Sequence, residues 1–213
     1  GAARAVADRD AAPPSGGRRG VSPLLLLASF AATLLAEGFT EVCDEHGVKV
    51  WRRDAARGFE LAAEGEIAAP PDEVLRVLAD YEEHPRWVAH LAESRVLHRS
   101  NDALDVYQRL ALPILADRDY TLHVAWGSDG AARWLRFAAA NELGPAPSKG
   151  VVRVEIHEGT WRLEPIDGGR ATRASYRVHL DLAGSLPGWM SRGRAAKDVP
   201  GFFERLRARV ARR

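Results

Sequence analysis

The stretch that decides the fold is residues 172–182, which read TRASYRVHLDL. Small or apolar side chains occupy most of the even positions, and polar or charged side chains occupy the odd ones. Alternation with a period of two predicts a β-strand with one buried face and one solvent-exposed face. The strand therefore belongs to an antiparallel sheet that covers a core on one side only.

The same alternation extends over most of the chain before this stretch. Further strands are predicted at residues 48–50, 59–67, 106–110, 120–126, 134–137 and 152–157. Turn residues separate them at 55–58, 128–130, 144–147 and 167–169. A single helix interrupts the strands: it opens at 69–73, where prolines and acids occupy the first turn, and is expected to end at Pro85.

The C-terminal segment from Pro187 onward has the period of an amphipathic helix. Its apolar stripe is formed by Val199, Phe202, Phe203, Leu206 and Val210. Pro200 and Gly201 are expected to kink or restart it. Because a sheet with one apolar face needs a cover, these elements predict an α+β fold in which a curved antiparallel sheet wraps around a long C-terminal helix. Such packing leaves an apolar hollow for a small hydrophobic molecule, unless side chains fill the space completely.

Composition excludes several classes of protein. With 46% hydrophobic and 28% charged residues the chain is not disordered, and its net charge of +1 argues against a nucleic-acid partner. The single Cys43 excludes an internal disulfide and a cysteine-based zinc site. The histidines have no metal-ligand spacing, and His123, His157 and His179 fall on the polar faces of their strands. We expect no metal, no cofactor and no catalytic residue.

Residues 1–38 differ from the rest of the chain. Residues 1–20 lack periodicity and predict a disordered leader, and Arg18 and Arg19 precede an apolar run at 23–36. This run is short for a membrane span but suits an export signal, which predicts a periplasmic or secreted protein. The alternative is that residues 23–36 form a buried helix of the folded domain, and the chain would then be cytoplasmic.

Three motifs carry a resemblance to a known family. The segment 112–120, LPILADRDY, is similar to the arginine–aspartate–aromatic signature of START (steroidogenic acute regulatory-related lipid transfer) domains. Residues 159–165, GTWRLEP, resemble the family's G-x-W-x-L-x-P strand, and residues 172–189 resemble its last strand and the loop that follows. The resemblance spans residues 39–213. It implies a helix-grip fold with a tunnel for one lipid-like ligand in a bacterial START-like protein.

Arg118 shares a strand face with apolar side chains, so its guanidinium needs a partner. The partner is either a polar group of the ligand or an internal acid, such as Asp117 or a glutamate on a neighbouring strand. Gln108 and Tyr176 are further candidates to orient a polar ligand end, and Trp189, Phe202 and Phe203 are either core anchors or a gate. The candidate cavity residues are Val106, Gln108, Leu110, Arg118, Tyr120, Leu122, Val124, Tyr176, Val178, Trp189, Phe202 and Phe203.

The sequence therefore predicts noncatalytic binding, and transfer, of a hydrophobic small molecule such as a lipid. The alternative is a polyketide cyclase or aromatase that uses the same cavity. Residues 188–213 carry eight basic and two acidic side chains, which favours transient contact with an anionic membrane surface or else a solvated helix face.

Overall fold

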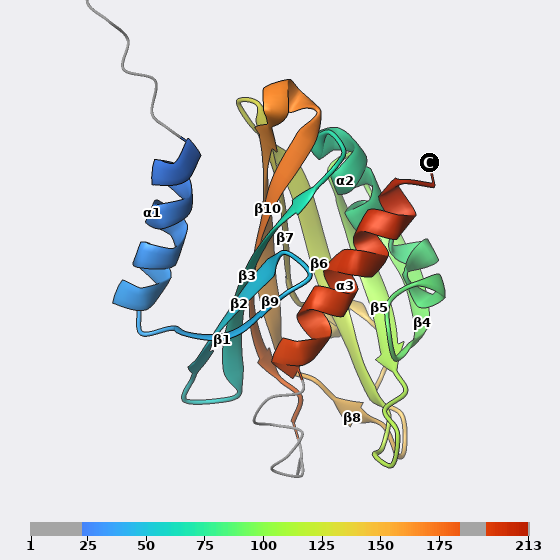
Figure 1. Ribbon diagram of the computed structural model, residues 1–213. Helices are drawn as coiled ribbons and strands as arrows, with labels where there is room; N and C mark the ends of the chain where they lie inside the picture. The colour runs from blue at the N-terminus through green and yellow to red at the C-terminus, as the bar shows by residue number, and fades with distance from the viewer. Residues whose placement is uncertain (1–22, 184–194, 213) are drawn as a thin grey trace, which may run out of the picture.

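The computed structural model describes residues 23–183 and 195–212, which form one large sheet with three α-helices (Figure 1). The elements follow in this order: α1 (Pro23–Ala36), β1 (Thr40–Glu45), β2 (Val48–Asp54), β3 (Phe59–Ile67), α2 (Pro71–Ala79), the 3-10 helix η1 (Tyr81–Arg86), β4 (Leu91–Arg99), β5 (Ala103–Leu110), β6 (Arg118–Asp129), β7 (Ala132–Ala139), the 3-10 helix η2 (Asn141–Leu143), β8 (Val152–Arg153), β9 (Ile156–Ile166), the 3-10 turn η3 (Asp167–Gly169), β10 (Ala171–Asp181) and α3 (Ala195–Val210).

The sheet is antiparallel along its whole path, in the order β1-β2-β3-β10-β9-β7-β6-β5-β4. The short strand β8 pairs in parallel with β6. The stretch that predicted the fold, now β10, lies near the middle of the path, where it pairs with β3 on one side and β9 on the other. The α+β helix-grip fold predicted from the alternation and the resemblance is confirmed.

The strands predicted from the sequence are present, but three details differ. Strand β1 and the full length of β4 were not predicted, because their side chains alternate poorly. Helix α2 begins at Pro71 as expected but ends at Ala79, and Pro85 lies inside the separate helix η1. Helix α3 runs through Pro200 as one element. The predicted beginning of that helix, including Trp189, lies outside the described residues.

Strand β9 departs from the predicted alternation. Residues 154–155 interrupt the strand between β8 and β9, so the inward-facing parity changes from Val154 to Trp161 and Leu163. Gly159 is required on β9, because an added Cβ would lie 2.4 Å from the Arg177 carbonyl oxygen and 2.7 Å from the Phe137 ring. This close approach explains the glycine in the G-x-W-x-L-x-P motif.

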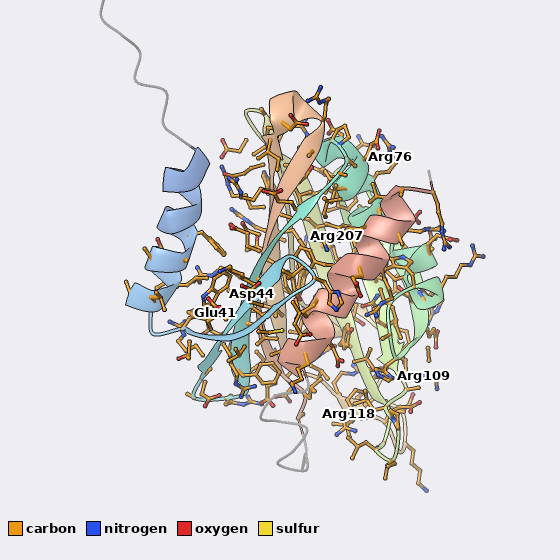
Figure 2. All side chains as sticks on the ribbon, in the orientation of Figure 1. Glu41, Asp44, Arg76, Arg109, Arg118 and Arg207 are labelled. Atoms are coloured by element: carbon orange, nitrogen blue, oxygen red, sulfur yellow. The ribbon has the colours of Figure 1, made fainter. Side chains whose placement is uncertain are left out.

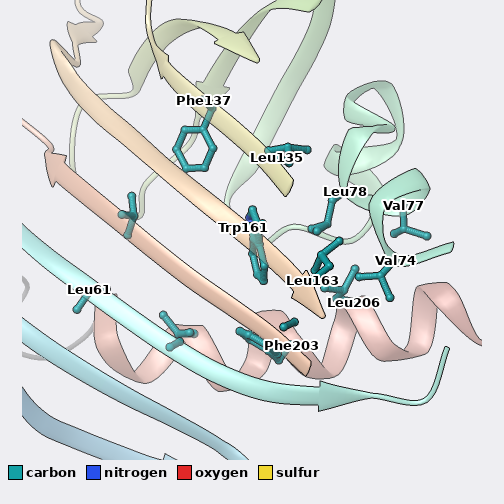
Figure 3. Close-up of a cluster of buried hydrophobic side chains, with 14 of the residues drawn as sticks. Leu61, Val74, Val77, Leu78, Leu135, Phe137, Trp161, Leu163, Phe203 and Leu206 are labelled. Atoms are coloured by element: carbon teal, nitrogen blue, oxygen red, sulfur yellow. The ribbon is translucent and has the colours of Figure 1, made fainter. Parts of the chain in front are cut away.

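The core lies between one face of the sheet and the helices α2 and α3. Val74, Val77 and Leu78 of α2 and Phe203 and Leu206 of α3 are all buried against it (Figure 3). These α3 residues belong to the apolar stripe predicted from the sequence. Burying such a stripe removes apolar area from water at about 25 cal/mol per Å², which makes α3 the cover that the sheet requires.

Polar contacts fix α3 over the first three strands. Arg207 donates from Nε to the Glu66 carbonyl oxygen at 2.8 Å and from Nη1 to the His46 carbonyl oxygen at 2.8 Å (Figure 2). On the other side of the helix, Arg209 forms an ion pair of 2.6 Å with Glu83 of η1. The helix is therefore held at both flanks.

Helix α1 lies on the opposite, outer face of the sheet (Figure 1). Leu34 is fully buried there with Phe39, Trp51 and Ala62, and the Phe30 ring meets Trp51 edge to face at 6.0 Å. The end of the apolar run 23–36 therefore packs on the sheet, while its role as an export signal or as a helix of the domain stays a prediction. Within the described residues, no helix is both long and apolar enough to cross a bilayer.

Because α3 covers the apolar face of the sheet, Leu206→Ala should destabilise the fold strongly. The side chain is fully buried, so its truncation should lower the free energy of unfolding by about 2–5 kcal/mol. The matched control is Leu35→Ala in α1, where the side chain is 60% exposed and the change should stay within about 0.5 kcal/mol. Urea unfolding of both variants checks the prediction, and equal effects would contradict it.

Candidate ligand-binding cavity

A cavity of about 320 Å³ lies between the inner face of the sheet, η1 and α3. Its walls come from β3, β5, β6, β7, β9 and β10, from the segment 88–91 and from Asp198, Val199, Phe202 and Arg205 of α3. Most of the wall is aliphatic or aromatic. A hollow of this size is at the lower end of the ~300–1,000 Å³ that small-molecule sites occupy.

The structure brings seven of the twelve candidate residues to this cavity. They are Gln108, Leu110, Tyr120, Leu122, Tyr176, Val178 and Phe202. Val106, Val124 and Phe203 do not line it, although they lie on the same faces of their elements. All three are fully buried in the packed core, because neighbouring side chains cover them where sheet and helices approach closely. Trp189 lies outside the described residues.

Arg118 does not line the cavity either. It is 3% exposed at the start of β6, near one end of the sheet together with Arg109 (Figure 2). Its Nη1 donates to the Ala116 carbonyl oxygen, and its Nε has no partner among the described residues. No ion pair joins Arg118 to Asp117, one of the internal acids considered as its partner; Asp117 lies 3.7 Å from Arg109 instead. The guanidinium is thus held by the chain's own backbone.

The aspartate of the arginine–aspartate motif has the structural role. Asp119 is 1% exposed and accepts hydrogen bonds from Arg153 Nε at 2.7 Å and Nη2 at 3.1 Å. The Tyr107 hydroxyl donates to the same carboxylate at 3.2 Å. These contacts tie the 145–153 segment to β6. A charge buried this deeply is stable only because it is paired and hydrogen-bonded.

Three tyrosines face the cavity from three different elements. Tyr81 lies in η1, Tyr120 in β6 and Tyr176 in β10. Burial is the main cause that raises the pKa of each phenol well above its ordinary value. Tyr176 also stacks on Trp161, with ring centroids 4.4 Å apart. The cavity therefore carries hydroxyl groups that stay protonated.

Three histidines also line the cavity, which the sequence did not predict: the exposed His90 and the two buried residues His84 and His157. His157 was expected on the surface, but the interruption before β9 turns it inward, with its ring edge to face with Tyr120 at 4.6 Å and Phe137 at 5.3 Å. His84 lies 3.1 Å from the Leu78 carbonyl oxygen through Nε2. Burial lowers the pKa of both imidazoles to about 4, so both are neutral at pH 7.

Charged side chains occur only on the helix side of the cavity wall. They are Asp198, which is exposed, and Arg205, whose Nε is buried without a partner among the described residues. Two other hollows open on the outer face of the sheet, but charged side chains such as Glu60, Arg162 and Arg177 line them. In the described part of the chain, His, Cys, Asp and Glu form no group of three or more suited to a metal ion.

The buried Asp119 pair predicts that Asp119→Ala lowers the free energy of unfolding by about 3–5 kcal/mol, because Arg153 would lose its buried counter-charge. Asp129→Ala is the matched control: this carboxylate is 69% exposed and pairs with Arg162 on the surface, so the loss should be below about 1 kcal/mol. Chemical denaturation measures both. A small loss for Asp119→Ala would contradict the structural role.

The neutral, buried His157 predicts a specific dependence of stability on pH. Its folded pKa of about 4 lies below the ordinary value of 6.5, so the unfolded chain binds a proton first as the pH falls. Stability should be unaffected above about pH 6.5 and should fall by about 2–3 kcal/mol from this group toward pH 4. In His157→Phe the loss should be smaller by that amount in urea titrations at each pH, and a loss equal to that of the wild type would contradict the prediction.

Comparisons with known proteins agree with this architecture. The sequence profile described as "Polyketide cyclase / dehydrase and lipid transport" matches residues 67–207. An uncharacterized protein of Pseudomonas aeruginosa is 26% identical over 180 residues, which cover 81% of this chain and 89% of that protein.

Solved structures show the same fold. The STAR-related lipid transfer protein fragment from Xanthomonas axonopodis is 26% identical, with a TM-score of 0.73 over 82% of this chain and 99% of that one. Human STARD10 has a TM-score of 0.73 at 20% identity over 92% of this chain and 83% of its own. The ZhuI aromatase/cyclase from Streptomyces has a TM-score of 0.51 at 18% identity over 76% and 95% of the two chains.

The last two similarities, at this level of identity, concern the fold alone. The profile match, by contrast, covers more than half of the chain and includes β4 to β10, α2 and most of α3. The chain has the fold of a hydrophobic-ligand-binding domain, and it belongs to the polyketide cyclase/dehydrase and lipid transport family as a bacterial START-like protein.

Proposed function

We propose that this protein binds one apolar small molecule, such as a lipid, in the cavity beneath α3 and does so without catalysing a reaction. The observation that carries the proposal is the cavity itself: a mostly apolar hollow of about 320 Å³ that the protein's own side chains leave unfilled. Empty apolar space costs packing contacts, so a ligand that fills it gains both dispersion and burial. Transfer between membranes is the finer proposal that the family supports.

The volume limits the ligand. At about 320 Å³ the cavity suits a single hydrocarbon chain or a compact ring system and leaves little room for two acyl chains. Leu110, Leu122 and Val178 supply aliphatic contact, and Trp161 and Phe202 supply flat aromatic surfaces 5.8 Å apart. Such walls recognise shape and apolar surface more than a fixed pattern of charge.

One observation favours the alternative, a cyclase or aromatase. His157 and Tyr120 place an imidazole and a phenol side by side in the cavity, which is an acid–base arrangement that the sequence analysis did not find. However, a general base works best when its pKa is near the operating pH, and burial holds the pKa of His157 at about 4. The imidazole is therefore a weak base, and we retain binding as the proposed function.

Contact with an anionic membrane stays a proposal. Two of the basic side chains that could make this contact, Arg207 and Arg209, already have partners within the protein. Arg209 is paired with Glu83, and Arg207 is committed to the carbonyl oxygens of Glu66 and His46.

Export of the chain through residues 1–38 also stays a proposal. Its support is the arginine pair ahead of the apolar run, although the last turns of α1 pack on the folded domain.

The proposal predicts that a bulky side chain in the cavity abolishes binding. Leu110 is half-buried at the cavity wall, so Leu110→Trp should place an indole in the void and reduce uptake of the neutral dye Nile red by at least about tenfold. Ala131→Trp, in the exposed β6–β7 turn, should leave uptake unchanged. Thermal melts verify that both variants fold.

Native mass spectrometry of the wild-type chain is the second test of the proposed function, because it detects a ligand that co-purifies with the protein. A co-purifying apolar molecule that is released intact supports binding, and a protein that excludes Nile red would contradict it. Turnover of a polyketide analogue that is lost in His157→Phe would establish the cyclase alternative instead.

A further inference from the structure

We propose that the ligand carries an uncharged hydrogen-bonding group, a hydroxyl or a carbonyl, which Tyr81, Tyr120, Tyr176 and His157 bind inside the cavity. The inference rests on the proposed binding function and specifies its ligand. The class is that of neutral alcohols and ketones with one apolar chain or a compact ring system, as opposed to ionised carboxylates and phosphates.

Three tyrosine hydroxyls at the cavity lack a protein partner in the described structure. Among the described residues, none forms a hydrogen bond with the hydroxyl of Tyr81, Tyr120 or Tyr176, although Tyr81 is 94% and Tyr120 96% buried. Tyr107 is the internal comparison, because its hydroxyl donates to Asp119 at 3.2 Å and does not face the cavity. All three tyrosines line the cavity, so a polar group inside the cavity is the partner that their hydroxyls can reach.

The His157 imidazole also lacks a protein partner among the residues that the structure describes. Neither ring nitrogen of His157 has a hydrogen-bond partner in the described part of the chain, and Nδ1 is buried. The cavity-facing His84, in contrast, is bonded to the Leu78 carbonyl oxygen. An imidazole that remains neutral can donate from one nitrogen and accept at the other. The orphaned groups together offer donors and acceptors, which suits a hydroxyl or carbonyl.

The unpartnered groups converge on one cavity. Tyr81, Tyr120 and Tyr176 all line it, each from a different element. His157 packs directly against Tyr120. Four elements, η1, β6, β9 and β10, therefore direct unpartnered polar groups toward one region of the cavity. A single polar group on a ligand can satisfy several of them.

The charge of the site decides the chemical class. Most of the remaining wall is aliphatic or aromatic; its other polar or charged side chains are His84, His90, Gln108, Asp198 and Arg205. Burial opposes ionisation of both the phenols and the His157 imidazole. The same burial would oppose an ionised ligand group. Arg205 supports the opposite ligand class. It is the one arginine or lysine that lines the cavity in the described chain, and it would favour an anionic ligand end on the helix side.

A matched pair of probes tests the inference on the full-length chain. 1-Decanol and decanoate share one hydrocarbon chain, and decanoate is ionised at about pH 8. We expect decanol to bind at least about tenfold more tightly, measured by quenching of tryptophan fluorescence, since Trp161 lines the cavity. The double variant Tyr120→Phe/Tyr176→Phe should weaken decanol binding about tenfold, the loss expected for two net hydrogen bonds.

The melting temperatures of the same variants distinguish ligand-binding hydroxyls from hydroxyls that only stabilise the fold. Because the two hydroxyls have no partner in the empty protein, the double variant should melt at the same or a higher temperature than the wild type. Tyr107→Phe, the matched control, should melt lower and keep decanol binding. A double variant with a lowered melting temperature and unchanged decanol affinity would overturn the inference.

Two further outcomes also overturn it and point elsewhere. Tighter binding of decanoate that is lost in Arg205→Gln would show that the site recognises an anion. Binding of Nile red but of neither decanol nor decanoate would exclude a role for the polar cluster while leaving the proposed function intact. Exclusion of Nile red as well would contradict the proposed function itself.

Discussion

Burial of the apolar stripe of α3 against the inner face of the sheet is the interaction on which the rest of the structure depends. The sheet exposes one row of apolar side chains per strand, and α2 covers only part of that face. Leu206 and Phe203 complete the cover, while Arg207 and Arg209 fix the helix to strands and to η1 on either side. Without this helix the sheet would present a large apolar surface to water.

The cavity follows from the same packing, because one helix cannot fill the whole concavity of a strongly twisted sheet. Where α3 approaches closely, at Leu206, the interior is solid. Nearer its beginning, at Val199 and Phe202, the helix becomes a wall of the hollow. Protein interiors are normally packed as densely as organic crystals, so an unfilled region with unpartnered polar groups is the feature on which the proposed binding rests.

The arginine–aspartate motif illustrates how a motif can serve the fold that holds a site. Asp119 binds Arg153 and Tyr107, and Arg118 folds back on the Ala116 carbonyl oxygen. Both lie one strand position or two from Tyr120, which does face the cavity. The motif thus positions the beginning of β6, and the residue that follows it reaches the ligand space.

The sequence by itself determined the fold class, most strand positions and seven of the cavity residues. It could do so because a period of two and a period of 3.6 report directly which face of an element is apolar. Tyr120, Leu122, Tyr176 and Val178 were predictable from parity alone.

Only the tertiary structure decided which apolar faces are packed solid and which line the void. Val106 and Tyr120 have equivalent patterns in the sequence, yet neighbouring elements cover the first and leave the second facing the cavity. His157 shows the other limit: two residues that interrupt β9 reverse the parity and turn a predicted surface histidine inward. The two residues lie between β8 and β9, and such register changes depend on pairing with distant strands, which local periodicity does not encode.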